Sequence, residues 1–173
     1  MKSVSLRKIV FSAMLAAVIT VATMIVRIPS PTGYVNLGDC FVLIAGWLLG
    51  PLYGFLVGGI GSGLADLLAG YPMYIAPTFI IKGLMSLCAW GVFRLLVLGG
   101  KNKVNSIVAG AVSAVCAEII MVAGYFITEV FMYDVMLAAQ SIIGNVVQGV
   151  VGAVAGVILI TIIRKSNLDK KIA

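Results

Sequence analysis

The sequence contains no histidine and few charged residues of either sign. Without histidine, His-ligated metal sites and catalytic triads built on an imidazole base are disfavoured. Charged residues make up only 10% of the 173 residues, whereas soluble domains contain about a quarter. Hydrophobic residues make up 62% of the chain, and the mean hydropathy is +1.17. Such a chain has too few polar groups to cover a water-exposed surface, so the composition indicates an integral membrane protein.

Cysteine and phosphate-binding motifs are also sparse. The three cysteines, Cys40, Cys88 and Cys116, lie far apart in apolar segments and form no CxxC pair, which is typical of inert buried thiols. No GxxxxGK[ST] loop is present, because the GGK segment at 99–101 lacks the upstream glycine and the Ser/Thr. We therefore expect that the chain is not an enzyme, does not hydrolyse ATP by that route, and uses no metal ion or cofactor.

The apolar runs predict an all-α fold with six transmembrane helices in one domain, residues 1–173. The first run ends at Arg27 without a small-residue cleavage site, so we interpret it as a span and not as a signal peptide. The apolar region 40–69 would be about 45 Å long as one helix, and Gly50-Pro51 divides it into two short spans. The predicted spans are residues 9–26, 38–49, 52–69, 76–98, 106–127 and 136–163.

The basic residues support this topology. All of the twelve Lys and Arg residues except Arg27 and Lys82 lie at the N-terminus, at the end of the fourth span or just after it, or at the C-terminus. Six crossings place all three clusters in the cytoplasm, as the positive-inside rule requires. Five crossings would place the two termini on opposite sides of the membrane. We therefore predict that both termini are cytoplasmic.

Isolated polar groups inside the predicted spans indicate a ligand cavity. Asp39, Asp66 and Lys82 lie at a similar depth in the outer leaflet, so either carboxylate could pair with Lys82. We predict a structural ion pair between Asp66 and Lys82, which lie on consecutive spans. Glu118 lies deeper, at about the level of Asn145 and Gln148. Polar groups in a membrane usually face a bundle interior or a water-filled cavity. Several of them converging in an apolar surrounding suit a small polar ligand.

Tyrosines gather in the two loops that are predicted to lie outside. The segments 27–39 and 69–77 carry Tyr34, Tyr71 and Tyr74, which can stack on a flat ring, although an ordinary aromatic belt would explain any one of them. The predicted ligand-binding residues are Tyr34, Asn36, Asp39, Tyr71, Tyr74, Lys82, Glu118, Asn145 and Gln148.

Four segments resemble the S component, the substrate-binding membrane subunit, of energy-coupling factor (ECF) vitamin transporters. They are AMLAA at 13–17, YVNLGD at 34–39, LLGPLYGFLVGGIGSGLADLLAGYP at 48–72 and FIIKGLM at 79–85. The resemblance covers most of the chain and is closest to the branch with B6- or hydroxymethylpyrimidine-type S components.

The resemblance implies a six-helix, multi-pass protein of the bacterial cytoplasmic membrane with an outward-facing vitamin pocket. Ala13 and Ala17 match the AxxxA stripe on which such proteins dock to a transmembrane coupling protein, and two cytoplasmic ATPases would complete the complex. No nucleic-acid partner is expected. A pyridoxine- or pyrimidine-type ligand is preferred, and riboflavin, cobalamin or a queuosine precursor are the alternatives.

Three other function classes would place different demands on the sequence. A self-sufficient facilitator or small channel would have a similar sequence but would need neither ATP nor partner subunits. A membrane-embedded enzyme is disfavoured because the chain has no histidine and no DxxD or ExxxE cluster on one helix. A structural subunit without a ligand would not need so many polar groups inside its spans.

Overall fold

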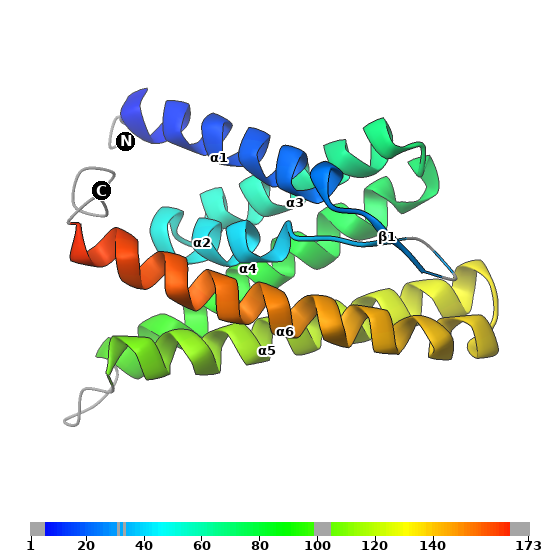
Figure 1. Cartoon of the computed structure of the whole chain (residues 1–173). Helices are drawn as coiled ribbons and strands as arrows, with labels where there is room; N and C mark the ends of the chain where they lie inside the picture. The colour runs from blue at the N-terminus through cyan, green and yellow to red at the C-terminus, as the bar shows by residue number, and fades with distance from the viewer. Residues whose placement is uncertain (1–5, 31, 33, 99–104, 167–173) are drawn as a thin grey trace.

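The computed structural model describes residues 6–30, 32, 34–98 and 105–166. These residues form six α-helices, which confirms the all-α class. A short hairpin and a 3-10 turn lie among them (Figure 1). The elements are α1 (Leu6–Ile25), β1 (Ile28–Pro29), β2 (Tyr34–Val35), α2 (Asp39–Leu49), α3 (Pro51–Ala69), η1 (Pro72–Tyr74), α4 (Ile75–Leu98), α5 (Ser106–Met132) and α6 (Val135–Lys165). Strands β1 and β2 pair antiparallel, with Ile28 opposite Val35.

Local sequence signals set several helix ends. The predicted break at Gly50-Pro51 is present: Gly50 has a φ of 83°, which glycine adopts readily, and Pro51 opens α3 without needing a backbone donor. The side chain of Asp134 caps α6 by accepting hydrogen bonds from the backbone N–H groups of Met136 and Leu137 at 2.7 and 2.8 Å. The fifth helix is longer than predicted and continues past residue 127 to Met132.

Five helices are long and apolar enough to cross a membrane, and α2 is the exception among the described helices. Its 11 residues give a length of about 16 Å, against about 30 Å of hydrocarbon. Almost every residue of α2 is buried inside the bundle. The number of crossings and the side on which the termini lie therefore stay predictions.

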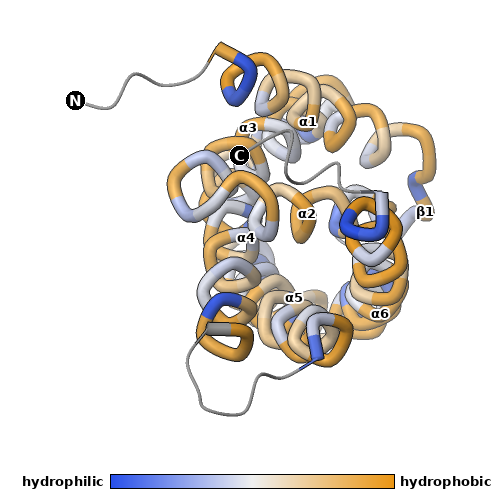
Figure 2. The backbone as a smooth tube through the Cα atoms, turned by 90° about the vertical axis from the view of Figure 1, so that its left-hand side faces the viewer, coloured by the Kyte–Doolittle hydropathy of each residue, from blue (hydrophilic) through white to orange (hydrophobic). Residues whose placement is uncertain are grey.

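The helices run along one common direction, with α2 in the interior (Figures 1 and 2). Helices α3 to α6 each pack against the next, α1 packs against α3, and α2 contacts α3, α4 and α6. The start of α1 and the ends of α4 and α6 lie at one end of the bundle, and the hairpin, η1 and the α5–α6 connection lie at the other (Figure 1). The described basic residues at the first end are Arg7, Lys8, Arg94, Arg164 and Lys165. The predicted clusters also include basic residues at 2, 101, 103, 170 and 171, which lie outside the described residues.

Close packing in the interior depends on small residues. A Cβ atom on Gly54 would lie 3.0 Å from the Cα of Gly46 and 2.8 Å from Ser86 Oγ, so α2, α3 and α4 approach each other where side chains are missing. The outward faces carry large exposed hydrophobic residues such as Ile119 and Ile143. This pattern suits a bundle whose outer surface contacts lipid and whose inner surface holds the polar groups.

Candidate ligand-binding site

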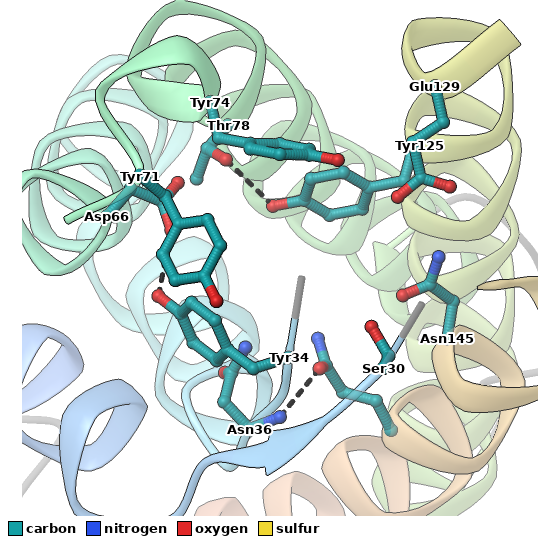
Figure 3. Close-up of a pocket in the computed structure, with 11 residues that line it drawn as sticks. Ser30, Tyr34, Asn36, Asp66, Tyr71, Tyr74, Thr78, Tyr125, Glu129 and Asn145 are labelled. Carbon is teal, nitrogen blue, oxygen red and sulfur yellow. Dashed lines mark hydrogen bonds between the residues drawn. The ribbon is translucent and has the colours of Figure 1, made fainter. Parts of the chain in front are cut away.

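A polar cavity lies at the end of the bundle that carries the hairpin and η1 (Figure 3). It is lined by Ser30, Tyr34, Asn36, Asp66, Tyr71, Tyr74, Thr78, Tyr125, Glu129, Asn145 and Gln148. The space left between these side chains is about 40 Å³, whereas typical ligand pockets measure about 300–1,000 Å³. The site is therefore assembled but nearly closed, and a vitamin-sized molecule enters only if lining side chains move apart.

Four tyrosines form a continuous row along this cavity (Figure 3). The ring centroids are 5.4 Å apart for Tyr34 and Tyr71, 6.4 Å for Tyr71 and Tyr74, and 6.4 Å for Tyr74 and Tyr125. These separations are normal for aromatic pairs that pack edge to face or tilted. The row joins β2, the end of α3, η1 and α5, so four distant parts of the sequence build one aromatic surface.

Asp66 contributes a buried carboxylate to the same cavity. Its Oδ1 accepts a hydrogen bond of 2.8 Å from the Tyr34 hydroxyl, while its Oδ2 has no partner among the described residues. Only 7% of Asp66 is exposed. Burial and the neighbouring Asp66 carboxylate raise the pKa of Tyr34 above its ordinary value, so the phenol stays neutral and continues to donate.

Glu129 fastens the connection before α2 to the two long C-terminal helices. Its carboxylate accepts hydrogen bonds from Thr32 Oγ1, at 2.8 Å, and from the Ser141 hydroxyl. The Tyr74 hydroxyl donates to the carbonyl oxygen of Thr32 at 2.9 Å. Thr32 is therefore held from two sides, and the chain near it forms part of the cavity wall.

The floor beneath the cavity is a second polar network. Gln148 accepts a hydrogen bond from the backbone N–H of Asn36 at 2.8 Å and donates one to Asp39 Oδ2 at 2.7 Å. The other oxygen of Asp39 forms an ion pair with Lys82. The predicted pair of Asp66 with Lys82 is thus wrong in its acidic partner. The interior position of α2 brings Asp39 to Lys82, which a comparison of depths along the helices does not reveal.

Glu118 lies outside the cavity. It borders an apolar groove of about 450 Å³ between α5 and α6, and it packs against Gly149 and Gly152. Glu118 is 6% exposed, and neither of its oxygens has a hydrogen-bond partner among the described residues. The prediction that Glu118 touches the ligand therefore receives no support from the shape of the cavity.

The structure brings most of the predicted ligand residues together. Those that line the cavity are Tyr34, Asn36, Tyr71, Tyr74, Asn145 and Gln148. Asp39, Lys82 and Glu118 do not line it. Ala13 and Ala17 lie far from the cavity in sequence and are exposed on the surface of α1. No group of three or more His, Cys, Asp or Glu residues in the described part of the chain is arranged to hold a metal ion.

Four lining residues were not predicted from the sequence, namely Ser30, Thr78, Tyr125 and Glu129, and Asp66 was predicted only as the structural partner of Lys82. Glu129 was missed because the fifth span was ended at residue 127, which placed it in a loop. Tyr125 and Glu129 are four residues apart, and Tyr125 is seven residues from Glu118. This spacing puts all three on one helix face and is the signal that would have identified them.

Comparisons with known proteins agree with this geometry. The sequence profile of the family described as "ECF-type riboflavin transporter, S component" matches residues 3–165. A protein of Pyrococcus woesei, described as "Uncharacterized protein in gap 3'region", is 36% identical over 140 residues, which cover 80% of this chain and 88% of that protein. A solved structure described as "Structure and mechanism of the S component of a bacterial ECF transporter" has a TM-score of 0.69 at 21% identity, covering 94% of this chain and 96% of that one. The last match shows a shared fold.

Proposed function

From the premise that the chain belongs to the family of ECF-type riboflavin transporter S components, we propose that its tyrosine-lined cavity captures a flat heteroaromatic vitamin for ATP-driven uptake. The family establishes the coarser role, a substrate-binding transporter subunit in the membrane. The observation that carries the proposal is the row of four tyrosines beside carboxylate and amide groups in one buried cavity. Stacking and a few placed polar groups are what such a ligand needs.

Riboflavin is the first ligand to test. The family description names it, whereas the resemblance of individual segments favoured a pyridoxine- or pyrimidine-type ligand. All of these molecules are flat rings that carry hydrogen-bonding groups at their edges. The aromatic row suits any of them, so riboflavin comes first and pyridoxine second.

Capture requires the nearly closed cavity to open. Tyr34 belongs to the two-residue strand β2, and Tyr71 follows the αL residue Gly70 at the end of α3. Both side chains therefore lie on short connections and not within the long helices. Movement of these connections would admit the ligand, and their return would exclude water from it.

Partner subunits supply the energy in this proposal. Ala13 and Ala17 are exposed on α1, where small side chains allow the backbone of another helix to approach closely. We assign this face to the transmembrane coupling protein, and ATP hydrolysis to two cytoplasmic ATPases. The absence of a phosphate-binding loop from this sequence fits that division of work.

Ligand titration of the purified protein in nanodiscs tests the proposal. We expect saturable binding of riboflavin or pyridoxine and about a tenfold loss of affinity in Tyr125→Ala. Tyr53→Ala is the matched control, because Tyr53 lies in the first turn of α3 and packs near Lys8, 4.8 Å from its ring centroid. Equal affinity in both variants would contradict the assigned site. Uptake by vesicles that contain this chain alone would favour a facilitator.

A further inference from the structure

We propose that Asp66 Oδ2 is the acceptor that selects the ligand, taking a hydrogen bond from an N–H group on the edge of its ring, and that the cavity admits only unphosphorylated forms. The inference rests on the proposed function and specifies the chemistry of its substrate. Asp66 is assigned a recognition role in place of the structural role that was predicted from its depth along the helix.

The two carboxylate oxygens of Asp66 differ in their hydrogen bonding. The Tyr34 hydroxyl donates to Oδ1 at 2.8 Å and fixes the orientation of the carboxylate. Oδ2 has no partner among the described residues although Asp66 is 7% exposed and lines the cavity. A buried acceptor without a donor is unfavourable, and a donor on the ligand would remove that cost.

The other carboxylate of the cavity and the Gln148 amide are already engaged. Glu129 accepts from Thr32 and Ser141, and both ends of the Gln148 amide are bonded, to Asn36 and to Asp39. The Thr78 hydroxyl lies close to Asp66 and shares a hydrogen bond with the Tyr125 hydroxyl at 3.0 Å, in which either hydroxyl can donate. Asp66 is therefore the lining carboxylate that has an oxygen without a hydrogen-bond donor among the described residues.

The two asparagines that line the cavity also differ in their hydrogen bonding. Asn36 Oδ1 accepts from the backbone N–H of Gly38 at 2.9 Å, which leaves its side chain committed to the start of α2. Asn145 makes no hydrogen bond to a described residue, and its amide can both donate and accept. A ring edge with adjacent N–H and C=O groups would satisfy Asp66 and Asn145 together.

The charge of the cavity supplies the restriction on phosphate. Two carboxylates, Asp66 and Glu129, line it, and no Lys or Arg is among its described lining residues. Lys82 is occupied by Asp39, and the Arg27 guanidinium lies 6.0 Å from the Tyr34 ring centroid. A phosphate ester would approach two carboxylates without a matched cation, which costs affinity in a buried site.

Ligand pairs that differ only at the relevant group test the inference on the wild-type protein. We expect riboflavin to bind at least about tenfold more tightly than 3-methylriboflavin, which lacks the ring N–H, and at least about tenfold more tightly than its 5′-phosphate. If pyridoxine binds, its ring nitrogen donates in the N-protonated zwitterion, and the pairs are pyridoxine with N-methylpyridoxinium and with pyridoxine 5′-phosphate. These comparisons use the wild-type protein, so they do not depend on whether a substituted protein folds.

A substitution then assigns the effect to Asp66. In Asp66→Asn the ratio of the affinity for the N–H ligand to that for the methylated ligand should fall to about one. Glu118→Gln changes a buried carboxyl group outside the cavity and should keep the wild-type ratio. Equal wild-type affinities for the methylated and unmethylated ligands, or an unchanged ratio in Asp66→Asn, would overturn the inference and leave the proposed function standing. Binding of neither vitamin would instead overturn the proposed ligand, and the inference with it.

Discussion

Lys82 of α4 forms an ion pair with Asp39 of α2, and both side chains are withdrawn from solvent, with 3% of Lys82 and 0% of Asp39 exposed. The second oxygen of Asp39 accepts from Gln148 of α6, which in turn accepts from the backbone of Asn36. The salt bridge and these two hydrogen bonds together form a network that connects α4, α2, α6 and the chain after β2. This network lies beneath the cavity. Because Lys82 pairs with Asp39, it forms no ion pair with Asp66.

This arrangement predicts that Asp39 is needed for stability. Asp39→Ala leaves the buried Lys82 ammonium without a counter-ion, so the free energy of unfolding should fall by about 3–5 kcal/mol. Thermal melting in detergent measures the loss. Asp39→Leu combined with Lys82→Met removes both charges and should recover much of it. A melting temperature for Asp39→Ala equal to that of the wild type would contradict the structural role of the pair.

Glu118 should be dispensable for binding. It lies outside the cavity and has no hydrogen-bond partner among the described residues, so Glu118→Gln removes no contact with the ligand. We expect ligand affinity within about twofold of the wild type and unchanged or higher thermal stability. A loss of about 1–3 kcal/mol in binding free energy would instead show that Glu118 contacts the ligand, as its depth in the sequence predicts.

The Tyr34 hydroxyl should matter more than the hydroxyl of its neighbour Tyr71. Tyr34→Phe keeps the ring but removes the donor that orients Asp66, so binding should weaken by about 1–3 kcal/mol. Tyr71→Phe is the matched control, since the Tyr71 hydroxyl makes no hydrogen bond to a described residue. Because the pKa of Tyr34 is raised above its ordinary value, the Tyr34 hydroxyl keeps its proton throughout the neutral and mildly alkaline range, and its hydrogen bond is not lost there. Equal titration curves for the two variants would contradict this role.

The exposed face of α1 should be required for transport and not for binding. Ala13→Trp combined with Ala17→Trp puts two large side chains on the proposed docking surface and should abolish ATP-driven uptake while ligand affinity is retained. Ile143→Trp, at a lipid-facing position of α6 that is 73% exposed, should leave both properties unchanged. Uptake by the double variant at the wild-type rate would exclude this face as the docking surface.

Features that depend on local chemistry were predictable from the sequence. Long apolar runs predicted the helices, since lipid requires every backbone group to be bonded within its own segment. Gly50-Pro51 predicted a break because the backbone of glycine is permissive and proline cannot extend the preceding helix. The loop tyrosines Tyr34, Tyr71 and Tyr74 were recognised as cavity residues from their clustering in two segments.

Which carboxylate neutralises Lys82 was decided only by the tertiary structure. Sequence position gives the depth of a residue along its helix, about 1.5 Å per residue, and Asp39 and Asp66 have similar depths. Pairing depends also on which helix lies inside and on the rotation of each helix about its axis. The short helix α2 is buried among α3, α4 and α6. Packing therefore pairs Lys82 with Asp39, and Asp66 faces the cavity beside Tyr34.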